Sequence, residues 1–425
     1  MNVYFTNRQF RALANSSFLN AMGSVLFNLV FLVYAQTLPF KTLAVSLVSI
    51  ANLMPSIFMI VNGYLADNTQ PRHRFRLVFE LRGIQGLLYF GLAFIIREPA
   101  TLKVFVILLL INVVSDLIAD YTSDLIMHYQ KLLLAGKDEY QTALGFSAGV
   151  HNIISMVFQA VGASLIVLLH NNFPLFAVIN GFSFLLAGFV LIHDRQLFIK
   201  LDNDQETVQS KKLEKRESLR VGMGHAIKIV YQDKQIFVMV MLAAGVNTLG
   251  LALDGLTSVL LASNHTLWIG GFASTVASIS IIGSLAITLS ALFMHDGLQH
   301  VSLPALTAVT MISLVFFSIN MCWWQSPIIM LTTMALASYP IGKINPRLQG
   351  DIFSKVDSKH LTATVSVIST VTMLGGPLGN FIFLGVANMI NPEIAWVVFG
   401  IVSLLVGIIA IICAVTLPNQ SESVN

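Results

Sequence analysis

Long apolar stretches recur along the whole chain, each about as long as a membrane-spanning helix. A helix needs about 20 apolar residues to cross the hydrocarbon core of a bilayer. Stretches of this length predict twelve transmembrane helices, which together fill most of the sequence. The predicted spans are 12–36, 42–66, 75–96, 102–128, 141–168, 173–193, 236–262, 267–294, 302–321, 327–353, 361–388 and 393–417.

One long polar segment interrupts this pattern, between His193 and Asp233, and separates six predicted spans from six. Its basic residues are Lys211, Lys212, Lys215, Arg216 and Arg220. The predicted organisation is an N-terminal six-helix bundle over residues 1–193, a cytoplasmic central linker over 194–235, and a C-terminal six-helix bundle over 236–425.

Composition decides the class of protein. Of 425 residues, 56% are hydrophobic and only 11% are charged, whereas a soluble domain carries about 25% charged residues. The net charge of +3 gives no indication of nucleic-acid binding. Cys322 and Cys413 are not expected to form a disulfide, and no cluster of potential ligands predicts a metal or another cofactor. The sequence therefore predicts an all-α integral membrane protein.

The distribution of charge between the loops predicts the orientation. With the N-terminus inside, the outer loops carry few basic residues: Lys41, Arg97 and Lys103. The inner segments carry many more: Arg72, Arg74, Arg76, Lys131, Lys137, the central linker, Lys355 and Lys359. Lys and Arg accumulate on the cytoplasmic side of membrane proteins. We expect both termini in the cytoplasm, no cleaved signal peptide, and a bacterial inner (cell) membrane as the location.

A motif at the end of the second span resembles the signature loop of the major facilitator superfamily. It begins with Gly63-Tyr64-Leu65-Ala66-Asp67 and continues to Arg72, His73 and Arg74. Gly63 is expected to let helices approach closely. Asp67 is expected to accept hydrogen bonds from a helix N-terminus or to pair with a base at the cytoplasmic mouth.

A second stretch strengthens this resemblance. Leu348-Gln349-Gly350-Asp351-Ile352 and, in the eleventh span, Gly375-Gly376-Pro377-Leu378-Gly379 are similar to macrolide-efflux-type permeases, which are drug:proton antiporters. The resemblance implies the major facilitator fold, with two pseudo-symmetric six-helix bundles and a substrate site between them. The chain departs from the family pattern at Asn68, at Asn112 in place of a fourth-span arginine, and in lacking a fifth-span proline.

Charged residues inside the spans are the main functional candidates, because each costs about 2.5–3.5 kcal/mol at the centre of a membrane helix. The fourth span carries three acids and the tenth mainly bases, each set spaced by four residues and so on one helical face. These residues are Asp116, Asp120 and Asp124 in the fourth span and Lys343, Arg347 and Asp351 in the tenth.

We expect an inner gate in which Asp120 or Asp124 pairs with Lys343 or Arg347. The alternative is that each set is satisfied within its own half, for instance Asp124 by Arg72 or Arg74. Burial and repulsion between like charges favour a protonated carboxyl. Asp116, the deepest of the three acids, is therefore one candidate for proton coupling, and Asp254, alone in the seventh span, is the other.

Closely spaced glycines predict sites of helix packing or hinging. Gly145 with Gly149, and Gly375 with Gly379, have the small-xxx-small spacing that allows close packing. Gly375, Gly376 and Pro377 together are also expected to kink or loosen the eleventh span. The sequence does not separate the hinge interpretation from the packing interpretation.

No phosphate-binding loop, nucleophile elbow or metalloprotease motif is present, so an enzyme is not expected. The favoured interpretation is a secondary transporter that works by alternating access and exports amphipathic small molecules or drugs against proton entry, as in antibiotic resistance. The alternatives are an uptake permease for a small solute and a non-transporting sensor or partner protein with the same fold. The expected partners are a small-molecule substrate, protons or sodium as the coupling ion, and lipid. A monomer suffices.

Overall fold

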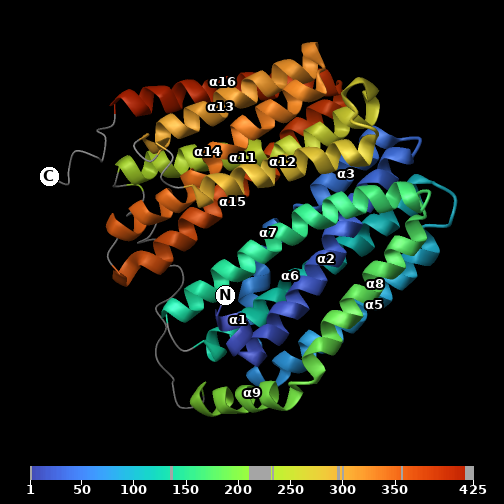
Figure 1. Cartoon of the computed structure of the whole chain (residues 1–425), viewed down its shortest axis with the longest axis vertical. Helices are drawn as coiled ribbons and strands as arrows, with labels where there is room; N and C mark the ends of the chain where they lie inside the picture. The colour runs from blue at the N-terminus through green and yellow to red at the C-terminus, as the bar shows by residue number, and fades with distance from the viewer. Residues whose placement is uncertain are drawn as a thin grey trace. The chain divides into compact units, whose positions relative to one another are not determined.

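The computed structural model describes residues 2–134, 137–209, 231, 234–293, 297–298, 301–355 and 358–416, and these residues are nearly all helical. Within them, twelve helical segments are long and apolar enough to cross a membrane. The twelve-span prediction is therefore confirmed, and we treat the chain as a multi-pass membrane protein. The chain divides into two compact units, Met1–Glu214 and Lys215–Asn425 (Figure 1).

The N-terminal unit contains α1 (Asn2–Thr6), α2 (Arg8–Thr37), α3 (Lys41–Ala51), α4 (Met54–Asn68), α5 (Pro71–Ile95), α6 (Leu102–Leu133), α7 (Lys137–Leu168), α8 (Phe173–Ile192) and α9 (Arg195–Gln209). The C-terminal unit contains α11 (Lys234–Ser263), η1 (His265–Leu267), α12 (Phe272–Leu292), α13 (Leu303–Ile319), η3 (Asn320–Trp324), α14 (Pro327–Lys355), α15 (Ser358–Met389) and α16 (Pro392–Thr416).

The two units repeat one packing scheme. In the N-terminal unit α2 packs on α7 and α8, α5 packs on α8 and α6, and α4 packs on α6. The C-terminal unit has the matching pairs, with α11 on α15 and α16, α13 on α16 and α14, and α12 on α14. Each unit is thus a bundle of six spans, and within both units the same pairs of spans, counted in order along the chain, pack against each other, as the resemblance implies.

The second span is not the single helix predicted over 42–66. It is interrupted at Asn52 and Leu53, between α3 and α4, and Pro55 lies in the first turn of α4. Proline has no N–H to donate and disfavours helical conformation in the residue before it. It is tolerated in a first turn, where that N–H has no partner in any case. The apolar pattern continues across the break, which is why hydropathy alone does not reveal it.

Glycines of α15 allow a close approach to α11. A Cβ added at Gly379 would lie 2.6 Å from the backbone oxygen of Thr248, and one at Gly375 would lie 2.2 Å from the Oγ1 of the same threonine. At Gly63 and Gly149, by contrast, an added Cβ would meet nothing within 4 Å among the described residues. The close packing predicted for those two glycines is therefore not found within their unit.

Substituting Gly379 with alanine should destabilise the protein. The new methyl group would collide with the backbone of α11, which cannot move aside as a flexible side chain can. Such overpacking costs about 1–3 kcal/mol. Thermal unfolding in detergent should show a lower melting temperature. Gly385→Ala is the matched control on the same helix, since a Cβ there meets no described residue within 4 Å. Equal melting temperatures for the two variants would contradict this packing.

The start of the predicted linker forms α9, which belongs to the N-terminal unit and packs on α5. Figure 1 shows α9 lying across the ends of the bundle helices. The fully buried Phe198 stacks on Phe75 of α5, with ring centroids 5.7 Å apart, and contacts Tyr129 of α6 edge-on. The basic residues of the linker, Lys211, Lys212, Lys215, Arg216 and Arg220, lie outside the described residues.

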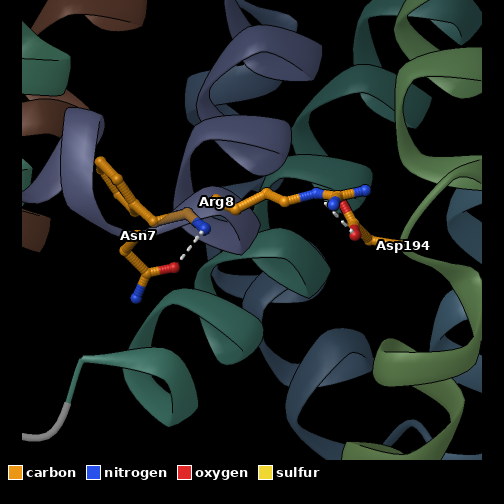
Figure 2. A network of polar contacts seen from close by, with 4 residues as sticks. Asn7, Arg8 and Asp194 are labelled. Carbon is orange, nitrogen blue, oxygen red and sulfur yellow. Dashed lines mark hydrogen bonds and ion pairs between the residues drawn. The ribbon is translucent and has the colours of Figure 1, made fainter.

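Polar contacts hold both the residue that precedes α9 and the buried face of α9 against the bundle. At its start, Arg8 of α2 forms an ion pair with Asp194, with 3.3 Å between Nε and Oδ1 (Figure 2). The preceding Asn7 caps α2 by accepting a hydrogen bond from the backbone N–H of Phe10 at 2.9 Å. Farther along, Asp202 is buried and accepts a hydrogen bond from the Tyr129 hydroxyl at 2.7 Å. Nothing in the polar linker sequence indicates that this acid is buried.

The docking of α9 should weaken as pH rises towards neutrality. Burial raises the pKa of Asp202 to about 6, against the opposing effects of the hydrogen bonds from Tyr129 and Phe75 and of the charge on Arg74. An unfolded aspartate titrates near about 3.9. The stabilisation by protonated Asp202 is therefore complete below about pH 4 and is lost as pH rises through about 6, a change of at most about 3 kcal/mol.

This pH dependence can be measured by comparing the wild-type protein with Asp202→Asn, whose amide stays neutral throughout. The melting temperature of the wild type relative to the variant should fall between about pH 4 and pH 7. A constant difference across that range would show that Asp202 does not titrate between the folded and unfolded states.

Candidate functional site

A chain of buried polar side chains runs through the interior of the N-terminal bundle. Arg82 of α5 is 1% exposed and donates hydrogen bonds from Nη1 to Asn20 of α2 and, at 3.1 Å, to Gln85. Gln85, fully buried, donates at 2.9 Å to the backbone oxygen of Ser115 on α6. The network therefore joins three membrane-spanning helices.

The network continues along α5 and α6 to an acid. The Tyr89 hydroxyl donates to Oδ1 of Asn112 at 2.8 Å, and the Asn112 amide donates to Oδ2 of Asp116 at 3.1 Å. Tyr89 and Asn112 are buried, whereas Asp116 is only partly buried. By the sequence resemblance given above, Asn112 stands in place of a fourth-span arginine. Here it links a tyrosine to a carboxylate.

The arginine and the acid lie at similar depths in the bundle. Gln85 is level with Ser115 and Tyr89 with Asn112, so α5 and α6 run antiparallel through this region. Arg82 lies three residues before Gln85 on α5. On the antiparallel α6 this corresponds to three residues after Ser115, so Arg82 is at the depth of about Ile118. Arg82 is therefore within about one helical turn of Asp116.

Arg82 and Asp116 each lack a partner of opposite charge among the described residues. Among the described residues, the buried Nε and Nη2 atoms of Arg82 have no hydrogen-bond partner. Asp116 receives one hydrogen bond, from the neutral Asn112. Moving an ion out of water costs several kcal/mol unless a counter-charge and hydrogen bonds offset that cost. A fold that retains two such groups inside a membrane-spanning bundle indicates a functional role for them.

Two of the predicted gate residues, Asp120 and Lys343, have hydrogen-bond partners within their own halves. Asp120 accepts a hydrogen bond from the amide of Asn62 on α4 at 3.1 Å. Lys343 is fully buried, and its ammonium group donates at 2.7 Å to the backbone oxygen of Phe293 and at 3.2 Å to that of Ser290. These two carbonyl groups lie at the C-terminal end of α12, where the helix dipole stabilises a cation.

These partners favour the alternative in which each set of charges is satisfied within its own half. The pairing of Asp120 or Asp124 with Lys343 or Arg347 stays a prediction, which a charge exchange between Asp120 and Arg347 would test. The surroundings of Asp67, Gly145, Arg347 and Asp351 lie outside the described residues.

The remaining candidates are dispersed. Asp254 lies on α11 with an exposed side chain, so it shares neither the burial nor the network of Asp116. Of the signature-loop bases, Arg72 is exposed and donates to Gln70, whereas Arg74 is buried near Asp202. Gly375, Gly376 and Pro377 lie within the continuous helix α15, so their hinge role stays a prediction.

Sequence reasoning missed the central member of the site. Arg82 is not among the site residues predicted from the sequence, and its side chain is buried in the bundle. A signal was present, since Arg82, Gln85 and Tyr89 are spaced by three and four residues and thus form one polar face of α5. On the neighbouring helix α6, Asn112, Ser115 and Asp116 form a corresponding polar face.

Comparisons with known proteins support the fold but no closer relationship. No protein-family model and no curated protein matches the chain in sequence. Among solved structures it is similar to a mutant form of the peptide transporter POT, with a TM-score of 0.69, 13% identity, and coverage of 95% of this chain and 94% of the other. It is also similar to the nucleoside transporter NupG, with a TM-score of 0.62, 13% identity, and coverage of 97% and 100%.

A POT family transporter in complex with 5-aminolevulinic acid matches as well, with a TM-score of 0.65, 12% identity, and coverage of 96% of each chain. The alignments extend over nearly the entire length of both partners in every case. Together with the twelve spans and the repeated packing scheme, they show that the chain has the major facilitator fold.

Proposed function

We propose that the chain is a secondary transporter, which moves a small solute across a membrane by alternating access and couples that movement to protons. The observation that carries the proposal is the presence of two buried groups, Arg82 and Asp116, that form no ion pair with each other or with another described residue. They have opposite charges, lie at similar depths inside the membrane-spanning N-terminal bundle, and lack ionic partners there. The fold supports the proposal, because peptide and nucleoside transporters share it.

In this mechanism Asp116 carries the proton. When Asp116 is ionised, the positive charge of Arg82 and the amide of Asn112 stabilise the carboxylate. When it is protonated, Arg82 is left as an uncompensated cation, which favours a different arrangement of the bundle. The proton thus changes the relative free energies of two conformations, as coupling requires. Asp254 stays the rival carrier.

Two directions of transport are open to such a protein. The resemblance to macrolide-efflux-type permeases favours proton-driven export of amphipathic small molecules or drugs from a bacterial cell. The shared fold with peptide and nucleoside transporters favours uptake of a small polar solute instead. A buried arginine also suits a solute with an anionic group, such as a carboxylate. In either direction a monomer with cytoplasmic termini suffices.

Accumulation of labelled solutes in cells tests the function. Cells that produce the wild-type chain are compared with cells that produce Asp116→Asn, across a panel of dyes, antibiotics, short peptides and nucleosides. Export predicts lower accumulation of an amphipathic compound, and uptake predicts higher accumulation of a nutrient. An uncoupler should remove either difference. No difference for any compound, with both proteins present in the membrane, would favour the non-transporting interpretation.

A further inference from the structure

A pocket of about 590 Å³ lies outside the polar network, between the start of α5, the end of α8 and the outer side of α9. Three arginines line it, two from the start of α5, Arg72 and Arg76, and one from the start of α9, Arg195. Glu80 is the acid in the lining, so the formal charge of the lining side chains is three positive and one negative, or +2. The pocket therefore favours an anion.

The same pocket has an apolar side. Phe79, Ile192 and Ile199 line it, and each is more than a third exposed. Apolar side chains exposed beside arginines fit a ligand that has both an anionic and a hydrocarbon part. A free inorganic anion would use the arginines but would leave the apolar side in contact with water.

The position of the pocket identifies the source of such a ligand. The membrane-spanning part of α8 ends at Ile192, and that of α5 begins at Pro71. The arginines thus lie where the hydrocarbon core gives way to the headgroup layer, and Phe79 lies two turns into the span. Basic pockets at this level of a membrane protein are suited to lipid phosphates.

We infer that this pocket, which we call the α5–α8–α9 pocket, binds an anionic phospholipid. Arg72, Arg76 and Arg195 hold the phosphate, and the acyl chains lie along Phe79, Ile192 and Ile199. Of the three arginines, Arg76 already pairs with Glu80 at 2.7 Å on an exposed surface, so its charge is partly neutralised. Arg72 and Arg195 are therefore the main contributors to binding.

The lipid would also join α9 to the bundle. Arg195 and Ile199 lie on α9, and the other lining residues lie on α5 or at the end of α8. A phospholipid that contacts both sides stabilises the docked α9 in the same way as any ligand that binds only the folded state. This contribution is independent of Asp202, whose side chain is on the buried face of the same helix.

Thermal unfolding of the full chain in detergent tests the inference directly. Added phosphatidylglycerol should raise the melting temperature of the wild-type protein more than phosphatidylcholine does, and inorganic phosphate should not. In the double variant Arg72→Gln/Arg195→Gln, the apparent dissociation constant for phosphatidylglycerol should increase at least about tenfold, since each interfacial base contributes about 1 kcal/mol. The matched control is Arg97→Gln/Lys103→Gln, which removes the same charge at exposed positions on the other side of the bundle and should behave as the wild type does.

Native mass spectrometry of the unaltered protein gives a second measurement that needs no variant. Phosphatidylglycerol should stay bound in preference to phosphatidylcholine after partial delipidation. Three results would overturn the inference: equal effects of the two lipids, an unchanged preference in the double variant, or a stabilisation that inorganic phosphate reproduces in full, which would indicate a site for free anions.

Discussion

Replacing Asp116 with asparagine should abolish proton-driven transport while leaving the fold intact. The side chain is almost isosteric with aspartate and can keep the contact with Asn112, but its amide cannot take up and release a proton. We expect proton-driven flux of the transported solute to fall at least about a hundredfold, comparable to the loss of one group that acts directly in proton transfer. Exchange of labelled for unlabelled solute, which needs no net proton movement, should persist.

The comparison has two further variants. Glu98→Gln removes an exposed acid from the loop after α5 and should leave flux unchanged. Asp254→Asn tests the rival carrier, and on the present account it retains proton-driven flux. If Asp116→Asn kept its dependence on the proton gradient while Asp254→Asn lost it, the assignment of the carrier to the N-terminal bundle would be wrong.

Replacing Arg82 with methionine should stop transport without lowering stability. Methionine fills a similar volume and removes a buried cation whose Nε and Nη2 have no partners. Removing an unpaired buried charge also removes its desolvation cost, which is several kcal/mol per ion. The melting temperature should therefore equal or exceed that of the wild type, whereas proton-driven flux should fall at least about a hundredfold. Arg82→Lys, which keeps the charge, should retain part of the flux.

Stability and flux together distinguish a functional arginine from a structural one. A structural role predicts that Arg82→Met melts at a lower temperature and loses flux only in proportion to the protein that is lost. If Arg82 and Asp116 act as a unit, the double variant Asp116→Asn/Arg82→Met should be no less active than either single variant. Independent roles would instead give losses that multiply.

The fold could be predicted from the sequence because the bilayer imposes strong constraints. Each span needs a long apolar helix, so the apolar pattern revealed all twelve, with the ends of α5, α8 and α16 close to their predicted positions. The break between α3 and α4 was missed, since Pro55 changes the backbone without interrupting the apolar pattern. The helix α9 was missed because a polar linker can still contain one buried face, here formed by Phe198 and Asp202.

The candidate site could be predicted only in part. Acids within an apolar span stand out in a sequence, and Asp116 was found in this way. Arg82 lies only a few residues from the basic start of α5, so its position in the sequence suggested the membrane surface, and only tertiary packing shows that its side chain is buried. The gate role of Lys343 stays a prediction; its ammonium group donates to two backbone carbonyls at the end of α12.

We expect solute movement to be coupled to protons through Asp116. The most direct test is to reconstitute the purified chain in liposomes that contain a pH-sensitive dye and to impose a gradient of the solute identified in cells. We expect the solute gradient to drive proton movement in the wild type, and we expect Asp116→Asn to move the solute without any change in internal pH. Solute movement without proton movement in the wild type, or unchanged proton movement in Asp116→Asn, would contradict it.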